Sequence, residues 1–85
     1  MPWIEFIWEW DDPEGNVAHL ALHDVVPEEA EHVVMNPQRE ELSESSGRPI
    51  RFGYTRAGRY IAVVFEWIDV TTVYPITAYD AEDQP

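Results

Sequence analysis

The 85-residue chain carries 17 Asp and Glu residues against five Lys and Arg residues, a formal net charge of −12, and contains no Cys. A chain of this length forms one domain with one modest core, and the missing Cys excludes disulfides, thiol catalysis and cysteine metal sites. No apolar run approaches the roughly 18 residues of a transmembrane helix, and the first residues lack the basic segment of a signal peptide. We therefore expect a single cytoplasmic domain over residues 1–85, without membrane contact.

The charge is also unevenly distributed, since all five cations are Arg and residues 1–38 contain no Lys or Arg. A negative surface repels phosphate backbones, which excludes broad, non-specific nucleic-acid binding but leaves room for a local Arg patch that binds one phosphate. The same field favours a basic partner protein. Two simpler explanations stay open, namely acidity that keeps a small domain dissolved and a cytoplasm of high salt.

The first predicted element is a strand over residues 3–10. Apolar and acidic residues alternate there, so that Ile4, Phe6, Trp8 and Trp10 share one face. Turn-forming residues 11–15 end the strand.

Two short helices are predicted next. Asn16 suits the N-cap of a helix from Val17 to about Asp24. On a helical wheel, its apolar stripe lies opposite His19 and His23 and consists of Val17, Ala18, Ala21, Leu22 and Val25. The second helix begins at Pro27, which suits a first helical position, and Asn36-Pro37 stops it. Its apolar stripe consists of Ala30, Val33 and Val34.

The remaining chain predicts a polar loop over residues 38–47 and three strands over 49–55, 59–68 and 72–79, with a tight turn at 56–58. Residues 61–65 are apolar on both faces, which indicates a central strand covered on both sides. Pro75 within the last strand indicates an edge position or a bulge. Residues 80–85 form an acidic tail that we expect to be flexible.

The order strand, helix, helix, strand, strand, strand predicts an α+β domain. We expect a four-stranded, mainly antiparallel sheet with both short helices on one face. Two short helices cannot cover both faces of the sheet. The uncovered face is expected to carry part of Phe65, Trp67 or their neighbours and to serve as a ligand groove or a homodimer surface.

Several segments, in this order and spacing, resemble the BrnT-type toxins of the RelE-like superfamily. The likeness covers roughly Trp8 to Ala81, and its matching pieces are Trp10-Asp11, His23-Asp24-Val25, Pro27-Glu28-Glu29-Ala30, Phe52-Gly53-Tyr54-Thr55, the segment from Gly58 to Phe65 and Ile76-Thr77-Ala78-Tyr79. The BrnT pattern has His-Gly-Val where this chain has His23-Asp24-Val25.

The resemblance implies a toxin-type ribonuclease that is held silent by an antitoxin and needs no metal or other cofactor. It implies cleavage by general acid–base chemistry at the RNA 2′-OH, with cations that stabilise the transition state. His23 and Arg59 occupy matching positions. The chain departs from the family at Tyr79, where an Arg is usual, and at Ala18 and Leu22, where basic residues are usual. A relative that kept the fold and lost or changed the activity is therefore also consistent with the resemblance.

The candidate catalytic residues are His19, His23, Arg48, Arg59, Glu66 and Tyr79. His19 and His23, four residues apart, suit an acid–base pair or two metal ligands. A metal would need a third ligand from Asp11, Asp12 or Glu14, and two ordinary surface His residues have the same spacing. Antiparallel pairing of strands is expected to bring Arg48 near Glu66, and an Arg that binds phosphate looks the same in sequence as one that pairs with Glu.

A second reading of the chain is a non-enzymatic module. Its acidic surface would engage a basic protein, and its open sheet face would form a homodimer. The sequence contains no Gly-rich phosphate loop and no nucleotide-binding fingerprint.

Overall fold

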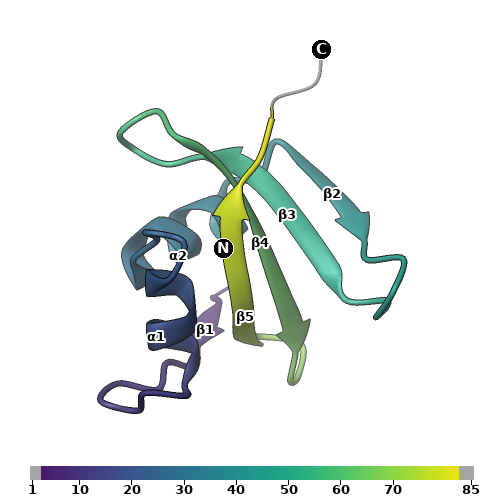
Figure 1. Cartoon of the computed structure of the whole chain (residues 1–85). Helices are drawn as coiled ribbons and strands as arrows, with labels where there is room; N and C mark the ends of the chain where they lie inside the picture. Colours follow the sequence, from purple (N-terminus) through teal and green to yellow (C-terminus); the bar gives the residue numbers. More distant parts are fainter. Residues whose placement is uncertain (1–2, 83–85) are drawn as a thin grey trace.

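The computed structural model describes residues 3–82, in which one mixed sheet carries two helices on one face (Figure 1). Five strands and two helices follow in the order β1 (Glu5–Phe6), α1 (Asn16–Ala21), α2 (Pro27–Met35), β2 (Arg39–Leu42), β3 (Pro49–Tyr54), β4 (Tyr60–Trp67) and β5 (Thr72–Asp80). The α+β class predicted from the sequence is confirmed. The predicted number of strands is wrong, because the sheet has five strands in the order β1-β5-β4-β3-β2.

The additional strand is β2, which lies within the segment predicted as a loop. It pairs antiparallel with β3 from Arg39 opposite Phe52 to Leu42 opposite Pro49. All four β2 residues are exposed, so the segment lacks the alternation of apolar and polar residues by which a half-buried strand is recognised. Its backbone pairing and the contacts of Arg39 and Glu40 with β3 side chains, described below, hold it at the sheet edge.

The first strand is much shorter than predicted. Only Glu5 and Phe6 pair with β5, and they do so in parallel. Ile4, Phe6 and Trp8 nevertheless pack against the core, as the alternation predicted. Trp10 does not, since 63% of its surface is exposed. The alternation therefore identified the buried face of this segment but not the length of its backbone pairing.

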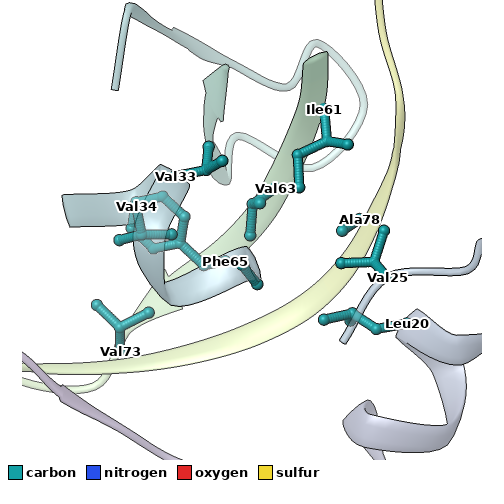
Figure 2. Packing of buried hydrophobic residues seen from close by; sticks show 10 residues of the cluster. Leu20, Val25, Val33, Val34, Ile61, Val63, Phe65, Val73 and Ala78 are labelled. Carbon is teal, nitrogen blue, oxygen red and sulfur yellow. The ribbon is translucent and has the colours of Figure 1, made fainter. Parts of the chain in front are cut away.

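The main core fills the space between the helices and the sheet (Figure 2). Val33 and Val34 of α2 lie over Val63 and Phe65 of β4, and all four are fully buried. β4 lies between β3 and β5, which confirms its prediction as the central strand. The remaining core residues come from α1, the segment after it, α2, β4 and β5, namely Leu20, Val25, Ala30, Ile61, Val73 and Ala78.

The open face of the sheet is built from different residues than expected. Phe65 is fully buried on the helix side, and the Trp67 ring packs edge-on against it at 5.7 Å between centroids. The residues of β4 that alternate with Ile61, Val63 and Phe65 point to the opposite face. There a second cluster consists of Phe52, Tyr60 and Ala62, flanked by Ile50, Tyr79 and Ala81. These side chains largely cover one another, since Ala62 is 0% exposed and Phe52 is 8% exposed.

Pro75 lies at an irregularity in the sheet, on a stretch of β5 that pairs with β4 on one side, since β1 pairs with β5 only at Thr72 and Val73. β5 pairs with both β1 and β4, and its register with β4 shifts between Val64 and Phe65. Val64 lies opposite Thr77 and Phe65 opposite Pro75, so one β5 residue is left over between them. The bulge interpretation of Pro75 is confirmed, because a bulge accommodates a residue that cannot donate to the ladder.

α1 is shorter than predicted and buries a different side. The helix spans six residues, and its buried residues are Asn16 and Leu20, whereas Leu22 of the predicted stripe is 79% exposed. Asn16 is not the N-cap. Its side chain accepts from the Glu9 backbone N–H at 2.9 Å and donates to the carbonyls of Ile7 at 2.8 Å and Pro75 at 2.9 Å. These tertiary bonds turn the Asn16–Leu20 side inward.

Candidate functional site

Three candidate residues form a row of rings between α1 and the open face of β5. The His19 and His23 ring centroids lie 6.3 Å apart, and the His23 and Tyr79 centroids lie 6.5 Å apart. His19 lies within α1, whereas His23 lies in the turn that follows the helix, and both are exposed. Tyr79 is half-buried on β5. The two exposed imidazoles and the half-buried phenol thus lie side by side in one row, with His23 in the middle.

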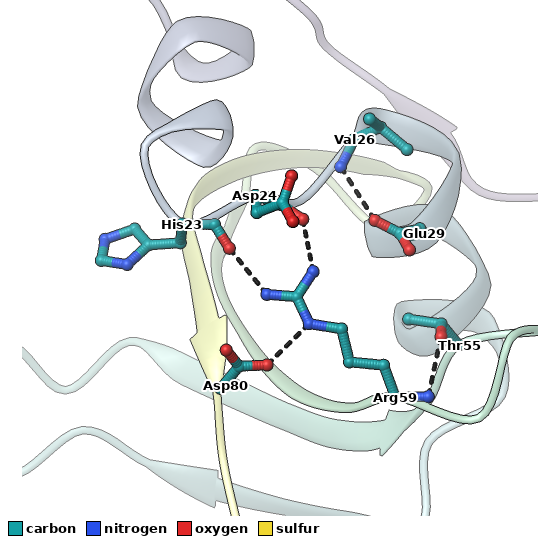
Figure 3. Close-up of polar contacts among 7 residues, drawn as sticks. All are labelled: His23, Asp24, Val26, Glu29, Thr55, Arg59 and Asp80. Carbon is teal, nitrogen blue, oxygen red and sulfur yellow. Dashed lines mark hydrogen bonds and ion pairs between the residues drawn. The ribbon is translucent and has the colours of Figure 1, made fainter.

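Arg59 lies beside this row, but its guanidinium is occupied by protein groups (Figure 3). Nε donates to Asp80 Oδ1 at 2.6 Å, Nη2 donates to the His23 carbonyl at 2.7 Å, and Nη1 donates to the Asp24 carbonyl. The last two bonds satisfy carbonyls of the turn that closes α1, in the manner of a C-terminal cap. Arg59 therefore holds the backbone that carries His23.

The ion pair perturbs both partners. The hydrogen bond from Arg59 is the main cause that lowers the pKa of the Asp80 carboxyl below its ordinary value of 3.8. The same bond is the main cause that raises the pKa of Arg59. Asp80 had been expected to begin a flexible tail. It is instead the last residue of β5 and anchors Arg59, while residues 83–85 of that tail lie outside the described residues.

The backbone between His23 and Val25 has an unusual conformation. Asp24 adopts a left-handed φ of +59°, which permits Val25 N–H to bond back to the Leu20 carbonyl at 3.1 Å. Gly adopts this conformation without steric cost, and Asp does so less readily. The BrnT pattern has Gly at this position, so the local geometry is the one that such a Gly would favour.

Arg48 and Glu66 form a separate pair on the open face. Arg48 Nε lies 3.9 Å from Glu66 Oε1, and both side chains are about half exposed, which confirms the predicted proximity. Glu66 lies four residues along β4 from Ala62, the partner of Tyr79, or about 13 Å at the usual rise of a strand. The structure therefore brings His19, His23, Arg59 and Tyr79 together and leaves Arg48 and Glu66 further along the sheet.

Most cations of the chain are neutralised locally. Within residues 3–82, four of the five Arg side chains lie within 4.0 Å of a carboxylate, in the pairs Arg39–Glu41, Arg48–Glu66, Arg51–Glu40 and Arg59–Asp80. Arg51 also donates to the Val34 carbonyl at 2.6 Å and so caps α2. These pairs leave little unbalanced positive charge near the row of rings. The surroundings of the row include Asp24 and Asp80.

Two further polar contacts could not be found from sequence periodicity. The Tyr74 hydroxyl donates to Glu9 Oε1 at 2.7 Å, and this bond is the main cause that raises the pKa of Tyr74. The Arg39 guanidinium lies 4.0 Å from the centre of the Phe52 ring on the open face. Both contacts join residues far apart in the chain, and neither has a local sequence signal.

In the described part of the chain, no third side chain joins His19 and His23 to form a metal site. Among residues 3–82, no group of three or more His, Cys, Asp or Glu side chains is arranged to hold a metal ion. Asp12, one of the three candidate ligands, instead accepts the Glu14 backbone N–H at 2.9 Å.

No helix within residues 3–82 is both long and apolar enough to cross a membrane. Comparisons of the chain with protein-family models, with curated proteins and with solved structures give no match.

Proposed function

We propose that the domain is a RelE-like, BrnT-type ribonuclease that cleaves RNA without a metal, with His19 and His23 as its acid and base. The observation that carries the proposal is the row of His19, His23 and Tyr79, in which the two imidazole centroids are 6.3 Å apart. Rings at this spacing can reach opposite sides of one phosphodiester by hydrogen bonds of ordinary length. The order of the elements and the quoted motifs add support from resemblance.

The proposed reaction needs no co-reactant. One imidazole removes the proton from the 2′-OH, and the 2′ oxygen attacks the adjacent phosphorus. The bond from phosphorus to the 5′ oxygen breaks, and the other imidazole, as imidazolium, protonates that leaving oxygen. The products are a 2′,3′-cyclic phosphate and a 5′-hydroxyl end. The Tyr79 hydroxyl would donate to a phosphate oxygen at the place of the family's Arg.

Arg59 takes a positioning role in this proposal. Its guanidinium binds the carbonyls of His23 and Asp24 and the carboxylate of Asp80, so it fixes the turn that carries His23. The transition state would then receive little cationic stabilisation. A slow ribonuclease follows from this arrangement.

A comparison of two substrates, with and without a free 2′-OH, tests the proposed chemistry. An RNA oligonucleotide and its fully 2′-O-methylated counterpart are incubated with the protein in EDTA, and the products are analysed by mass spectrometry. The proposal predicts cyclic-phosphate ends from the RNA and an intact 2′-O-methylated strand. Cleavage of both strands would contradict it, because the methylated strand has no 2′-OH to attack phosphorus.

A second candidate is a non-enzymatic module that binds a basic protein, such as an antitoxin. The observation that favours it is the pairing of four Arg side chains with carboxylates in a chain whose formal charge is −12. Such a field attracts basic partners and steers their association. The homodimer part of this candidate is less well supported, because Phe52, Tyr60 and Ala62 on the open face are already 8%, 9% and 0% exposed. Light scattering at high protein concentration tests it, and a monomer would contradict a dimer.

A further inference from the structure

The outer side of α1 is an apolar surface that the fold leaves uncovered. The helix turns Asn16 and Leu20 toward the sheet, so the predicted stripe faces outward along the helix, and only its last member, Val25 beyond the helix, is buried in the core. Ala21 and Leu22 are exposed, and Val17 and Ala18 are only half-buried. In a domain of 85 residues, which has few apolar residues to spare for its core, an outward apolar helix face indicates a partner.

This surface is hollowed. A depression of about 340 Å³ has Pro13, Val17, Ala18 and Ala21 as its apolar lining. A smaller neighbouring depression shares Pro13 and Ala18 with it and extends to Leu22. Small side chains such as Ala let the backbone of a second helix approach closely, at the interaxial distance of about 8–10 Å that packed helices adopt.

The rim of the larger depression is acidic. Glu9, Asp11 and Asp12 line it, and Lys and Arg are absent from the first 38 residues of the chain. Glu9 accepts the Asn16 backbone N–H at 2.9 Å and the Tyr74 hydroxyl at 2.7 Å through the same oxygen, so its position is fixed. The two Asp residues are exposed. An apolar floor with a carboxylate rim is complementary to an apolar helix face bordered by Lys or Arg.

We propose that the outer face of α1 binds an amphipathic helix of a basic partner protein. The apolar side of that helix would cover Val17, Ala18, Ala21 and Leu22, and its cations would lie against Asp11 and Asp12. A second copy of this chain suits the surface poorly, because it would bring another −12 of charge and the same acidic rim to the interface. The inference rests on the partner-binding candidate and does not depend on RNA cleavage.

The test uses a synthetic Leu/Lys amphipathic helical peptide, with a scrambled peptide of equal composition as its control. Binding to the full chain is titrated by NMR, which reports the amide shifts and the Kd. We expect saturable binding with shifts confined to residues 9–22, and at least tenfold weaker binding of the scrambled peptide, whose apolar residues no longer share one face.

Two Lys variants separate this surface from general charge attraction. Ala21→Lys places a cation on the floor of the depression, at an exposed helical position that tolerates Lys. Val70→Lys adds the same charge at a 93% exposed position between β4 and β5. We expect Ala21→Lys to weaken binding at least tenfold and Val70→Lys to change it less than twofold. Equal losses in both variants, or shifts centred outside residues 9–22, would overturn the inference.

Two further measurements test the role of the acidic rim in peptide binding and the oligomeric state of the protein without peptide. Asp11→Asn keeps a side chain that tolerates the left-handed φ of +62° at this position. It should weaken binding at low salt and have little effect at high salt. A dimer of the unmodified protein that Ala21→Lys dissociates would instead assign the surface to self-association and overturn the inference. Peptide binding at another face would leave the partner-binding candidate in place without this surface.

Discussion

Arg59, at the entry to β4, joins Asp80 at the end of β5 through a bond of 2.6 Å and at the same time holds the carbonyl of His23 at 2.7 Å. Three segments that are distant in the chain thus meet at one guanidinium. The planar fork of Arg suits this task, because several N–H groups donate in fixed directions. The residue that the family resemblance marks for chemistry is therefore built into the frame that carries the candidate site.

This role predicts a loss of stability when Arg59 is replaced. Arg59→Ala removes three donors from carbonyl and carboxylate acceptors, and Arg59→Lys cannot reproduce the fork. We expect each variant to lower the free energy of unfolding by about 1–3 kcal/mol, measured by urea denaturation. Arg56→Ala, at an exposed position in the adjoining turn, serves as the control with a change within about 0.5 kcal/mol. Equal stability of Arg59→Ala and the unmodified protein would show that Arg59 is not structural.

Asp80 gives this ion pair a pH dependence. Its pKa is lowered in the folded state, mainly by the hydrogen bond from Arg59. A carboxyl with a lowered folded-state pKa stabilises the fold at pH values above its ordinary value of 3.8, and that contribution is lost as the pH falls through the folded-state value. Urea denaturation of the unmodified protein and Asp80→Asn should therefore differ by a constant amount near neutral pH and converge below pH 3.8. A difference that persists unchanged at the acidic end would contradict this assignment.

The observed orientation of α1 predicts unequal effects on stability at two Leu residues. Leu20 is 0% exposed and Leu22 is 79% exposed. Leu20→Ala should cost about 2–5 kcal/mol of unfolding free energy through lost burial and the cavity left behind. Leu22→Ala should stay within about 0.5 kcal/mol. Chemical denaturation of both variants measures the difference. Greater destabilisation by Leu22→Ala would restore the orientation predicted by the helical wheel.

Asp24 offers a stabilising substitution. Its backbone is left-handed, with a φ of +59°, so Asp24→Gly should raise the free energy of unfolding by about 0.5–1 kcal/mol. Asp24→Asn removes the charge but keeps a side chain that tolerates this conformation, and it therefore separates the two effects. Thermal unfolding of both variants checks the prediction. A lower stability of Asp24→Gly than of Asp24→Asn would show that strain at this residue is negligible.

The parts of the fold that could be predicted are those with strong local patterns. Residues 61–65 are apolar on both faces, and this pattern correctly placed β4 at the centre of the sheet. Pro27 and the stripe of Ala30, Val33 and Val34 correctly defined α2 and its buried face. In each case burial follows directly from the period of the apolar residues.

The sequence-based predictions fail where tertiary contacts decide the structure. β2 is a strand although all of its residues are exposed, because its edge position is set by pairing with β3. α1 has only six residues, so the bonds of Asn16 to distant backbone groups outweigh its apolar stripe. The same holds for the candidate site. Helical spacing predicted that His19 and His23 lie close together, but the bonds of Arg59 to β5 and to the turn after α1 depend on the folded arrangement.

The proposed acid–base role of His19 and His23 is tested most directly by the variants of the two residues. Both side chains are exposed, so His19→Ala and His23→Ala should unfold within a few degrees of the unmodified protein. Their rates of RNA cleavage in EDTA should fall by about 10²–10⁴-fold, the usual contribution of a general acid or base. His32→Ala on α2 is the matched control and should retain full activity.

The decisive measurement is the single-turnover rate of RNA cleavage in EDTA by the unmodified protein and His23→Ala, prepared in parallel. We expect slow cleavage by the unmodified protein that survives EDTA and is lost in His23→Ala. No cleavage by the unmodified protein, or the same rate in His23→Ala, would contradict the ribonuclease proposal and leave the binding of a basic partner as the function to pursue.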